Sequence, residues 1–370
     1  MKSRKTTFAL GFCASILCAC LAGNAQAQQS SPYPVVQGKY YKFEKIAGGV
    51  YYASPEFNGT AFPFGSNPFF GANLVVIVND NDVLIVDSAT SPAAARAFVA
   101  DIKLLTDKPV RYVVNTHWHY DHTDGNSIFG PEVQIIAHDY VRQAIEKFDV
   151  LKNEPFRSST RNAGPALIAG FKKQIAAQND PRLKAALEKK LADTEAAMKA
   201  FVHDITEIKP TPPNLTYTSK LVLHRGGREI DLLFLGRGHT GGDTVVFLPK
   251  EHIVCTGDLM ESRIAYMGSA YFDEWLTTLD ALKRLDFTVD LPGHGAPFSN
   301  KGLITAFQSY LSDVLAQVAK LRAQGVSADE AAKRVDLTSH AKDFPDIQGL
   351  GAEVGGIRRV YAWMDERSRK

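Results

Sequence analysis

The sequence predicts a layered α/β protein, and three observations support this prediction. The chain has 370 residues, enough for one large domain or two ordinary ones. Hydrophobic residues make up 45% of the chain, which is ample for a buried core. From Leu74 onward, apolar β-branched runs alternate with segments of helical periodicity, a pattern typical of stacked sheets and helices.

The strands are predicted by short apolar runs that end at polar or glycine-rich turns. The first two runs, 74–79 (LVVIVN) and 83–87 (VLIVD), flank the polar turn 80–82 and predict a hairpin. A helix is expected over 91–106. Further strands are expected at 110–115, 133–137, 220–224, 229–235, 244–248, 252–256 and 288–291.

A segment from about 141 to 214 interrupts the strands and has helical spacing. Its apolar residues share one face, which predicts packing against the core: Leu183, Leu187, Leu191, Met198 and Phe201. A second apolar stripe begins at Gly302, and residues 327–330 (SADE) have capping-box spacing. We therefore expect one domain, 28–300, that includes the insertion, with C-terminal helices over 301–370 packed on it.

The first 27 residues predict a secretory signal peptide. Three basic residues precede an apolar stretch, 8–21, that is too short to cross a bilayer, and AQA at 25–27 resembles a cleavage site. We expect cleavage after Ala27 and a periplasmic or secreted protein without a stable membrane span. A lipoprotein anchored at Cys20 is the alternative that the LCAC motif at 17–20 leaves open.

Loss of this leader changes the charge and the cysteine content. The leader carries three of the 42 basic residues and none of the 40 acidic ones, which leaves 39 basic residues and a near-neutral chain. Nucleic-acid-binding proteins usually show a basic surplus, so we expect a small-molecule partner and no nucleic acid. Only Cys255 remains, so no internal disulfide can form. The sequence leaves the oligomeric state open.

Residues 117–122, HWHYDH, concentrate side chains that bind metals, directly after a predicted strand. His117 and His119 are separated by one residue, so on an extended segment they point the same way. Asp121 and His122 follow where the chain turns. Imidazole and carboxylate groups together suit zinc and neighbouring borderline cations, which predicts a metal site.

Three later strands end in a similar way. The runs at 229–235, 252–256 and 288–291 are followed by His239, Asp258 and His294, with glycine close to each. Glycine lets the backbone turn closely around a small site, and loops at strand ends are where α/β folds carry their chemistry. We therefore expect loops that are distant in sequence to meet at one place.

The ordered set His117-x-His119-x-Asp121-His122, then His239, Asp258 and His294, resembles the metallo-β-lactamase superfamily. The resemblance covers about residues 45–300. It implies an αββα sandwich, the metallo-β-lactamase fold, with two Zn²⁺ ions, or other divalent metals, at one edge between the sheets. The protein would then be an exported metallo-hydrolase.

The resemblance also implies a role for each ligand. One ion would bind His117, His119 and His239; the other would bind Asp121, His122 and His294; Asp258 would bridge the two. Asp87, at the end of the VLIVD run, would stand behind the ligands and orient their loop. The bridging aspartate resembles the metal set of glyoxalase II and the lactonases.

The implied activity is that of a binuclear zinc-dependent hydrolase, in which a metal-bridged hydroxide attacks the carbonyl of a lactam, lactone or ester. Asp121 is the expected catalytic residue, because its carboxylate can help to place the nucleophile. Candidates for binding the oxygens of a small-molecule carbonyl substrate are Arg237, Arg263 and Tyr266.

Two alternative functions remain at this stage. One is a β-lactamase proper, although Glu261 stands where several such enzymes carry a lysine that holds the drug. The other is a non-catalytic periplasmic metal-binding protein that has kept the fold. The aromatic segment 57–71 and the helical insertion are expected near the mouth of the site, the insertion as either a lid or an interface.

Overall fold

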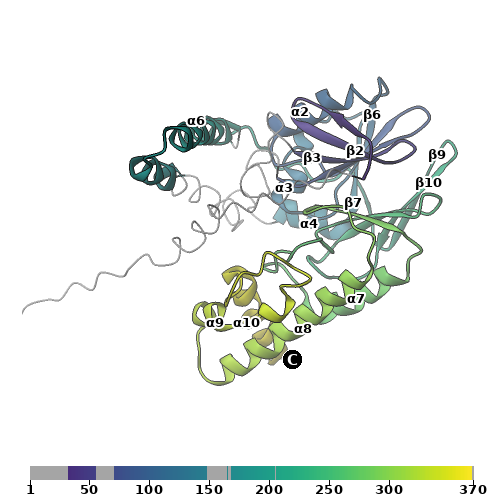
Figure 1. Cartoon of the computed structure of the whole chain (residues 1–370). Coiled ribbons are helices and arrows are strands. Elements are labelled where there is room, and N and C mark those ends of the chain that lie inside the picture. The colour runs from purple at the N-terminus through teal and green to yellow at the C-terminus, as the bar shows by residue number, and fades with distance from the viewer. Residues whose placement is uncertain (1–31, 56–70, 148–164, 166–167, 205, 369–370) are drawn as a thin grey trace, which may run out of the picture.

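The computed structural model describes residues 32–55, 71–147, 165, 168–204 and 206–368 (Figure 1). The predicted signal peptide and most of the aromatic segment 57–71 lie outside these ranges.

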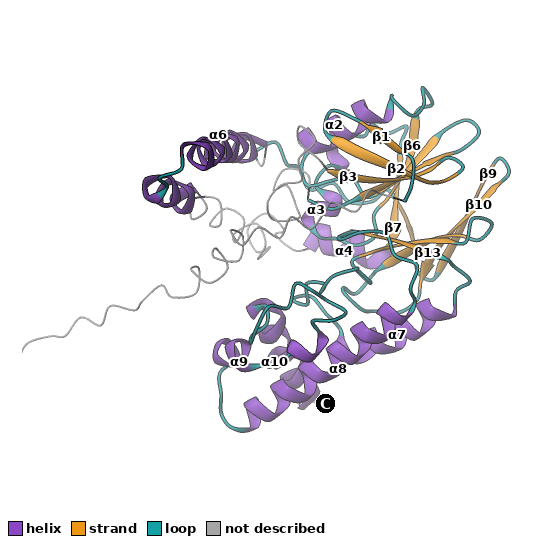
Figure 2. Cartoon of the chain, in the orientation of Figure 1, coloured by secondary structure: helices purple, strands orange, loops and turns teal. Residues whose placement is uncertain are grey.

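Two β-sheets form the centre of the described structure (Figure 2). The larger sheet has eight strands in chain order: β1 (Val35–Gln37), β2 (Tyr41–Ala47), β3 (Val50–Pro55), β4 (Leu74–Val78), β5 (Val83–Val86), β6 (Val110–Val114), β7 (Gln134–His138) and β8 (Leu215–Tyr217). The smaller sheet has the order β13-β12-β11-β10-β9, with β9 (Lys220–Arg225), β10 (Arg228–Phe234), β11 (Thr244–Leu248), β12 (Ile253–Gly257) and β13 (Val289–Pro292).

Strand directions bring the functional loops to one edge. β4 and β5 form the predicted antiparallel hairpin, and β5 to β8 run parallel to one another. In the smaller sheet, β10 and β12 are both antiparallel to β11, and β13 is parallel to β12. The carboxyl ends of β10, β12 and β13 therefore meet at the same edge of that sheet.

The sheets pack face to face through alternating side chains. In β4, Val75 and Ile77 belong to an apolar cluster shared with the smaller sheet, through residues such as Leu232 and Val246. The alternate residues Leu74 and Val76 belong to a second cluster on the outer face, with the helix that covers it. Because the central strands are covered on both faces, they are almost wholly apolar.

Helices cover both outer faces, which confirms the αββα sandwich. On the larger sheet, α2 (Pro92–Ile102) contributes to the outer cluster and α4 (Asp139–Lys147) contacts β7. On the smaller sheet lie α7 (Phe272–Arg284), α8 (Gly302–Ala323), α9 (Ala328–Arg334) and α10 (Val354–Ser368), which share a third apolar cluster with it. The remaining described elements are α3 (Tyr120–Thr123), η1 (Asn126–Ile128), α6 (Pro181–Asp204) and η2 (Thr338–His340).

Two helix starts follow from their capping residues. Ser91 accepts a hydrogen bond from the backbone N–H of Ala94 at the start of α2, where Pro92 is the first helical residue. Ser327 accepts one from the N–H of Glu330 at the start of α9, as the capping-box spacing predicted.

The structure differs from the sequence prediction in four places. Strand β8 at the end of the larger sheet was not expected, since the next strand after the insertion was placed at 220–224. Strands β1 to β3 extend the larger sheet at its amino-terminal side, and α7 follows β12; neither was predicted. The prediction that the apolar stripe of the insertion packs in the core is wrong at Leu183, which is 54% exposed on α6. Met198, further along α6, does pack against the outer cluster. Figure 1 shows α6 projecting from the side of the sandwich.

Among the described residues, no helix combines the length and the apolar character needed to cross a membrane.

Candidate metal centre

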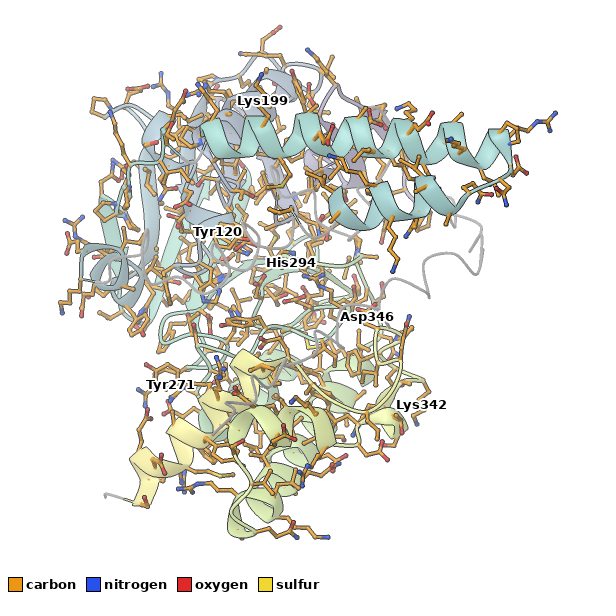
Figure 3. All side chains as sticks on the ribbon, turned by 90° about the vertical axis from the view of Figure 1, so that its left-hand side faces the viewer. Tyr120, Lys199, Tyr271, His294, Lys342 and Asp346 are labelled. Atoms are coloured by element: carbon orange, nitrogen blue, oxygen red, sulfur yellow. The ribbon has the colours of Figure 1, made fainter. Side chains whose placement is uncertain are left out.

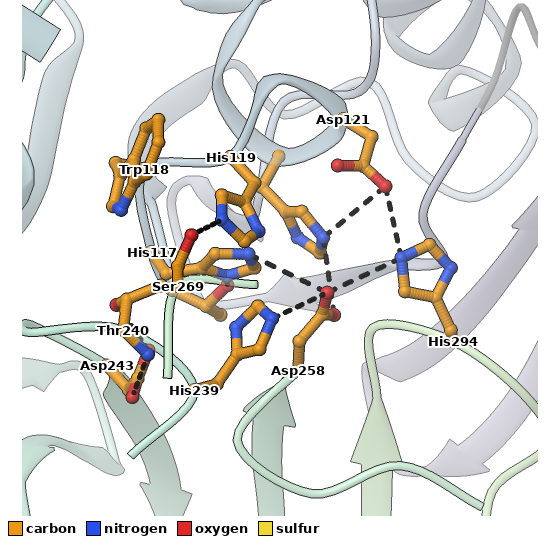
Figure 4. Close-up of polar contacts among 12 residues, drawn as sticks. His117, Trp118, His119, Asp121, His239, Thr240, Asp243, Asp258, Ser269 and His294 are labelled. Carbon is orange, nitrogen blue, oxygen red and sulfur yellow. Dashed lines mark hydrogen bonds and ion pairs between the residues drawn. The ribbon is translucent and has the colours of Figure 1, made fainter. Parts of the chain in front are cut away.

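The loops that follow four strands bring together the seven side chains predicted as ligands (Figure 4). The loop after β6 and the short helix α3 carry His117, His119, Asp121 and His122. The loops after β10, β12 and β13 carry His239, Asp258 and His294, respectively. All seven are buried, none being more than 8% exposed.

The ligand atoms fall into two groups within the described part of the chain. His117, His119, His239 and Asp258 each offer an atom within 4.8 Å of the others, and we call these residues the first group. Asp121, His122 and His294 meet the same limit and form the second group.

Asp258 contacts both groups. Its Oδ2 lies 3.7 Å from Nε2 of His117 in the first group. Its Oδ1 lies 3.3 Å from Nε2 of His122, and its Oδ2 lies 3.6 Å from Nε2 of His294, both in the second group. One carboxylate therefore stands between the two sets of donors (Figure 4).

Three of the histidines are held by a contact on the outward ring nitrogen. Nδ1 of His117 lies 3.0 Å from Oγ1 of Thr116, and Nδ1 of His122 lies 2.7 Å from Oδ2 of Asp87. Nε2 of His119 lies 3.0 Å from Oγ of Ser269. Each of these contacts leaves the other ring nitrogen for the interior of the cluster.

Asp87 is placed behind the ligand loop and is linked to both groups. Its carboxylate accepts hydrogen bonds from the N–H and the hydroxyl of Thr116, at 2.7 and 2.8 Å, besides its contact with His122. The residue adopts a left-handed backbone conformation, φ 64°, which costs about 1–3 kcal/mol outside glycine. The surrounding hydrogen bonds hold this conformation.

The donor atoms of the cluster suit a cation. In the described structure, five of them are buried and form no hydrogen bond: Nε2 of His117, Nε2 of His122, Nδ1 and Nε2 of His239, and Oδ1 of Asp258. Unpaired buried polar atoms are costly, and native proteins contain few of them. Divalent metals bind this mixture of imidazole nitrogen and carboxylate oxygen, so the residues present fit a metal site.

Burial keeps the histidines of the first group in their neutral form. Burial lowers the pKa of His119 to about 3 and that of His239 to about 4. Burial likewise holds the pKa of His117 well below its ordinary value, helped by the neighbouring His122. All three imidazoles are therefore neutral near pH 7, the state in which a lone pair is available to a metal.

In the second group, the charged forms of the side chains are favoured instead. Burial lowers the pKa of His122, but the carboxylates of Asp258, Asp87 and Asp121 together raise it well above its ordinary value. The pKa of Asp121 falls to about 2, because His122 and His294 outweigh the effect of burial. This half of the site therefore attracts positive charge.

Two glycines allow the loops to approach this closely. A Cβ atom on Gly293 would lie 2.3 Å from Oδ1 of Asp258 and 2.8 Å from Cε1 of His122. Gly257 has a left-handed backbone, φ 53°, and a Cβ there would lie 2.4 Å from Oγ1 of Thr116. Any larger residue at either position would push the ligand loops apart.

Two of the three predicted substrate-binding residues lie beside the cluster. Nε of Arg263 donates a hydrogen bond to Glu261, at 2.9 Å, and its charge acts on Asp258 and His294. Burial, together with the charge of Asp258, raises the pKa of Glu261 to about 7. The ring of Tyr266 has its centroid 5.9 Å from that of His119.

Arg237 is engaged elsewhere. Its guanidinium pairs with Glu274 and lies over the ring of Tyr271, 4.3 Å from the centroid. These contacts place it in a cluster of side chains at the start of α7, and the structure does not bring it to the ligands.

Two of the described residues that contact a ring nitrogen of a ligand were not predicted. Thr116 precedes His117 directly, and a hydroxyl next to a candidate ligand is a signal that the sequence offers. Ser269 is 150 residues from His119 in the chain, and no local pattern marks it.

Two stacked sheets covered by helices, with an imidazole and carboxylate cluster at the strand ends, define a class of metal-binding α/β proteins. The family model of the metallo-beta-lactamase superfamily matches residues 67–294, which is more than half of the chain. The chain therefore belongs to the metallo-beta-lactamase superfamily, as the ligand pattern indicated.

Two relatives that match most of the chain share low sequence identity with it. The chain is 23% identical to a linear primary-alkylsulfatase from Pseudomonas sp., over 75% of this chain and 53% of the relative. It is 23% identical to the alpha subunit of 2,4-dinitroanisole O-demethylase from Nocardioides sp., over 73% of this chain and 66% of the relative. The chain thus spans about half to two thirds of the length of these relatives.

Among solved structures, a metallo-beta-lactamase from Pontibacter korlensis matches with a TM-score of 0.49 and 17% identity, covering 74% of this chain and 99% of that one.

Proposed function

We propose that this protein is a binuclear, zinc-dependent hydrolase that acts on a lactam, lactone or ester. The observation that carries the proposal is the pair of ligand groups that share Asp258. A single-ion site would not need a second set of donors from α3 and from the loop after β13. Membership of the superfamily and the hydrolase named among its relatives support the reaction type.

Divalent ions bound to these groups would acidify a water molecule and polarise the carbonyl of the substrate. Side chains of the protein would position the attacking water and provide a positive charge for the substrate. Oδ2 of Asp121 lies 3.0 Å from Nε2 of His294, and this contact fixes its carboxylate at the edge of the second group. Asp121 can then accept a hydrogen bond from the attacking water and orient it. Arg263 offers a positive charge to a substrate oxygen beside the cluster.

Among the described residues, cysteine supplies no competing nucleophile. Cys255 lies within β12 and is 1% exposed. Burial raises the pKa of its thiol well above the ordinary value, so the reactive thiolate is disfavoured.

A second candidate substrate is a sulfate ester. The similarity to an alkylsulfatase extends over 75% of this chain, well beyond the ligand motif. A sulfate group carries a negative charge, and the guanidinium of Arg263 lies beside the cluster to receive it.

A panel of substrates tests these proposals. The purified protein is assayed with a chromogenic cephalosporin, a lactone, an aryl ester and an alkyl sulfate, with and without a chelator. We expect hydrolysis of at least one compound, lost with chelator and in H239A, and unchanged in H224A, whose histidine lies on β9 with its side chain 71% exposed. Cephalosporin turnover alone would identify a β-lactamase, and zinc binding without turnover would indicate a metal-binding protein.

We also propose that residues 1–27 are removed on export, that the mature protein is periplasmic or secreted, and that residues 301–370 form helices packed on a 28–300 domain. Mass spectrometry of the exported protein tests the first two points. We expect a new amino terminus after Ala27. A lipid-modified terminus at Cys20 would instead show a lipoprotein.

A further inference from the structure

We propose that Ser269 is a positioning residue that directs Nδ1 of His119 into the first group, and that helix α10 holds Ser269 in place. The inference rests on the proposed metal site. It assigns to the C-terminal helices a part in building that site.

The contact between Ser269 and His119 selects one ring nitrogen. Oγ of Ser269 lies 3.0 Å from Nε2 of His119, so Nδ1 is the nitrogen left for the cluster (Figure 4). When Nδ1 offers its lone pair, the proton of a neutral imidazole resides on Nε2 and is donated to the hydroxyl oxygen. The serine therefore stabilises both the tautomer and the ring orientation that a ligand needs.

His119 makes its outward contact through the other ring nitrogen than His117 and His122 do. His117 and His122 make their outward contacts through Nδ1, to Thr116 and Asp87, and turn Nε2 inward. The rings of His117 and His119 lie nearly perpendicular, at 79°, with centroids 4.7 Å apart. A flip of the His119 ring would place Cδ2 where Nδ1 now lies and Cε1 where Nε2 now lies, so the partner of Nε2 keeps Nδ1 directed inward.

Helix α10 fixes the segment that carries Ser269. Nε of Arg359, on α10, donates a hydrogen bond of 2.9 Å to the carbonyl of Ala270, the residue after Ser269. Ala270 and Met267 are buried in the same apolar cluster as Ile357 of α10. The backbone on both sides of Ser269 is thus anchored to the C-terminal layer.

This layer flanks the site in space. In Figure 3, His294 lies between α6, which carries Lys199, and the C-terminal part of the chain, which carries Lys342. The hydrogen bond from Arg359 to Ala270 places α10 beside the segment that carries Ser269, although none of the seven ligands lies on α10.

Zinc affinity of the full-length protein tests the role of Ser269. Each variant is titrated against a chromophoric chelator, and the two equivalents are fitted separately. We expect S269A to weaken one equivalent by about 10–100-fold, the usual loss when an outer contact to a ligand is removed. S269T keeps the hydroxyl and should restore most of the affinity. S309A, which removes a serine hydroxyl from the exposed side of α8, should match the wild type.

The role of α10 has its own pair of variants. R359A removes the bond to Ala270 and should weaken the same equivalent, by less than S269A does. E366A removes the ion pair of Arg359 with Glu366 but leaves the bond to Ala270, so its affinity should remain that of the wild type.

The outcomes separate this inference from the proposed function. A wild-type protein that binds no zinc would refute the proposed function. A wild type that binds two equivalents, with S269A equal to it or S269T as weak as S269A, would overturn the role of Ser269 alone. An R359A protein that binds zinc as the wild type does would overturn the role of α10.

Discussion

The two ligand groups share Asp258 but differ in how the chain prepares them. In the first group, burial lowers the pKa of His119 and His239, which leaves neutral nitrogen donors. In the second group, the surrounding carboxylates raise the pKa of His122 and thereby favour its protonated form. The first half therefore presents free lone pairs, whereas in the second half a proton competes with the metal.

Removal of Asp258 should have the largest effect, because its carboxylate stands between the donor atoms of both groups. We expect D258A to lose affinity for both zinc equivalents by more than the roughly 100-fold upper range for an outer contact. Hydrolysis should fall in parallel. The measurement is zinc titration together with turnover of the best substrate from the panel. A D258A protein that loses only one equivalent would show that the aspartate belongs to one group.

The pH dependence of zinc binding should distinguish the two halves. Since the pKa of His122 is raised, zinc must displace its proton, and the affinity of the second group should rise with pH by up to about tenfold per unit through neutrality. The first group should show little change between pH 6 and 8, because the pKa values of His119 and His239 are about 3 and 4. Titrations at pH 6, 7 and 8 provide the test. Equal slopes for both equivalents would contradict the difference between the groups.

Asp290 provides a comparison, because it is a buried carboxyl to which the described part of the chain offers no cationic partner. It is 0% exposed on β13, accepts a hydrogen bond of 2.6 Å from Thr256, and burial raises its pKa well above 3.8. Its folded state therefore favours the protonated form. The stability that this pKa shift contributes is fully present below the pKa of the unfolded state, near 4. It is lost as the pH rises from there toward the pKa of the folded state.

D290N should therefore gain stability relative to the wild type as the pH rises. The gain is limited to about 1.4 kcal/mol per pH unit within that window. Chemical denaturation of both metal-free proteins at pH 5 and 8 measures it. An identical difference in unfolding free energy at the two pH values would show that Asp290 does not titrate as proposed.

The sequence predicted the parts of the site that follow strand ends. His117, His239 and His294 come after apolar runs and near glycine, and strand direction then brings them together. Such a pattern is local, so it can be recognised without the structure.

Contacts set by tertiary packing were not predictable in this way. Ser269 reaches His119 because the segment around it is anchored to α10, almost 90 residues later in the chain. Arg237 lies close to His239 in sequence, yet it forms an ion pair with Glu274 on α7. The sequence did not predict this helix. The exposure of Leu183 has a similar origin, since helical spacing alone does not show what faces the stripe.

The zinc content of the protein is the most direct test of a site built from two groups around one carboxylate. Full-length protein is purified, saturated with zinc and dialysed, and its zinc content is measured by inductively coupled plasma mass spectrometry. We predict two zinc ions per chain in the wild type and one or fewer in the H117A/H239A double variant. A wild type with no retained zinc, or a double variant with the same content as the wild type, would contradict the account.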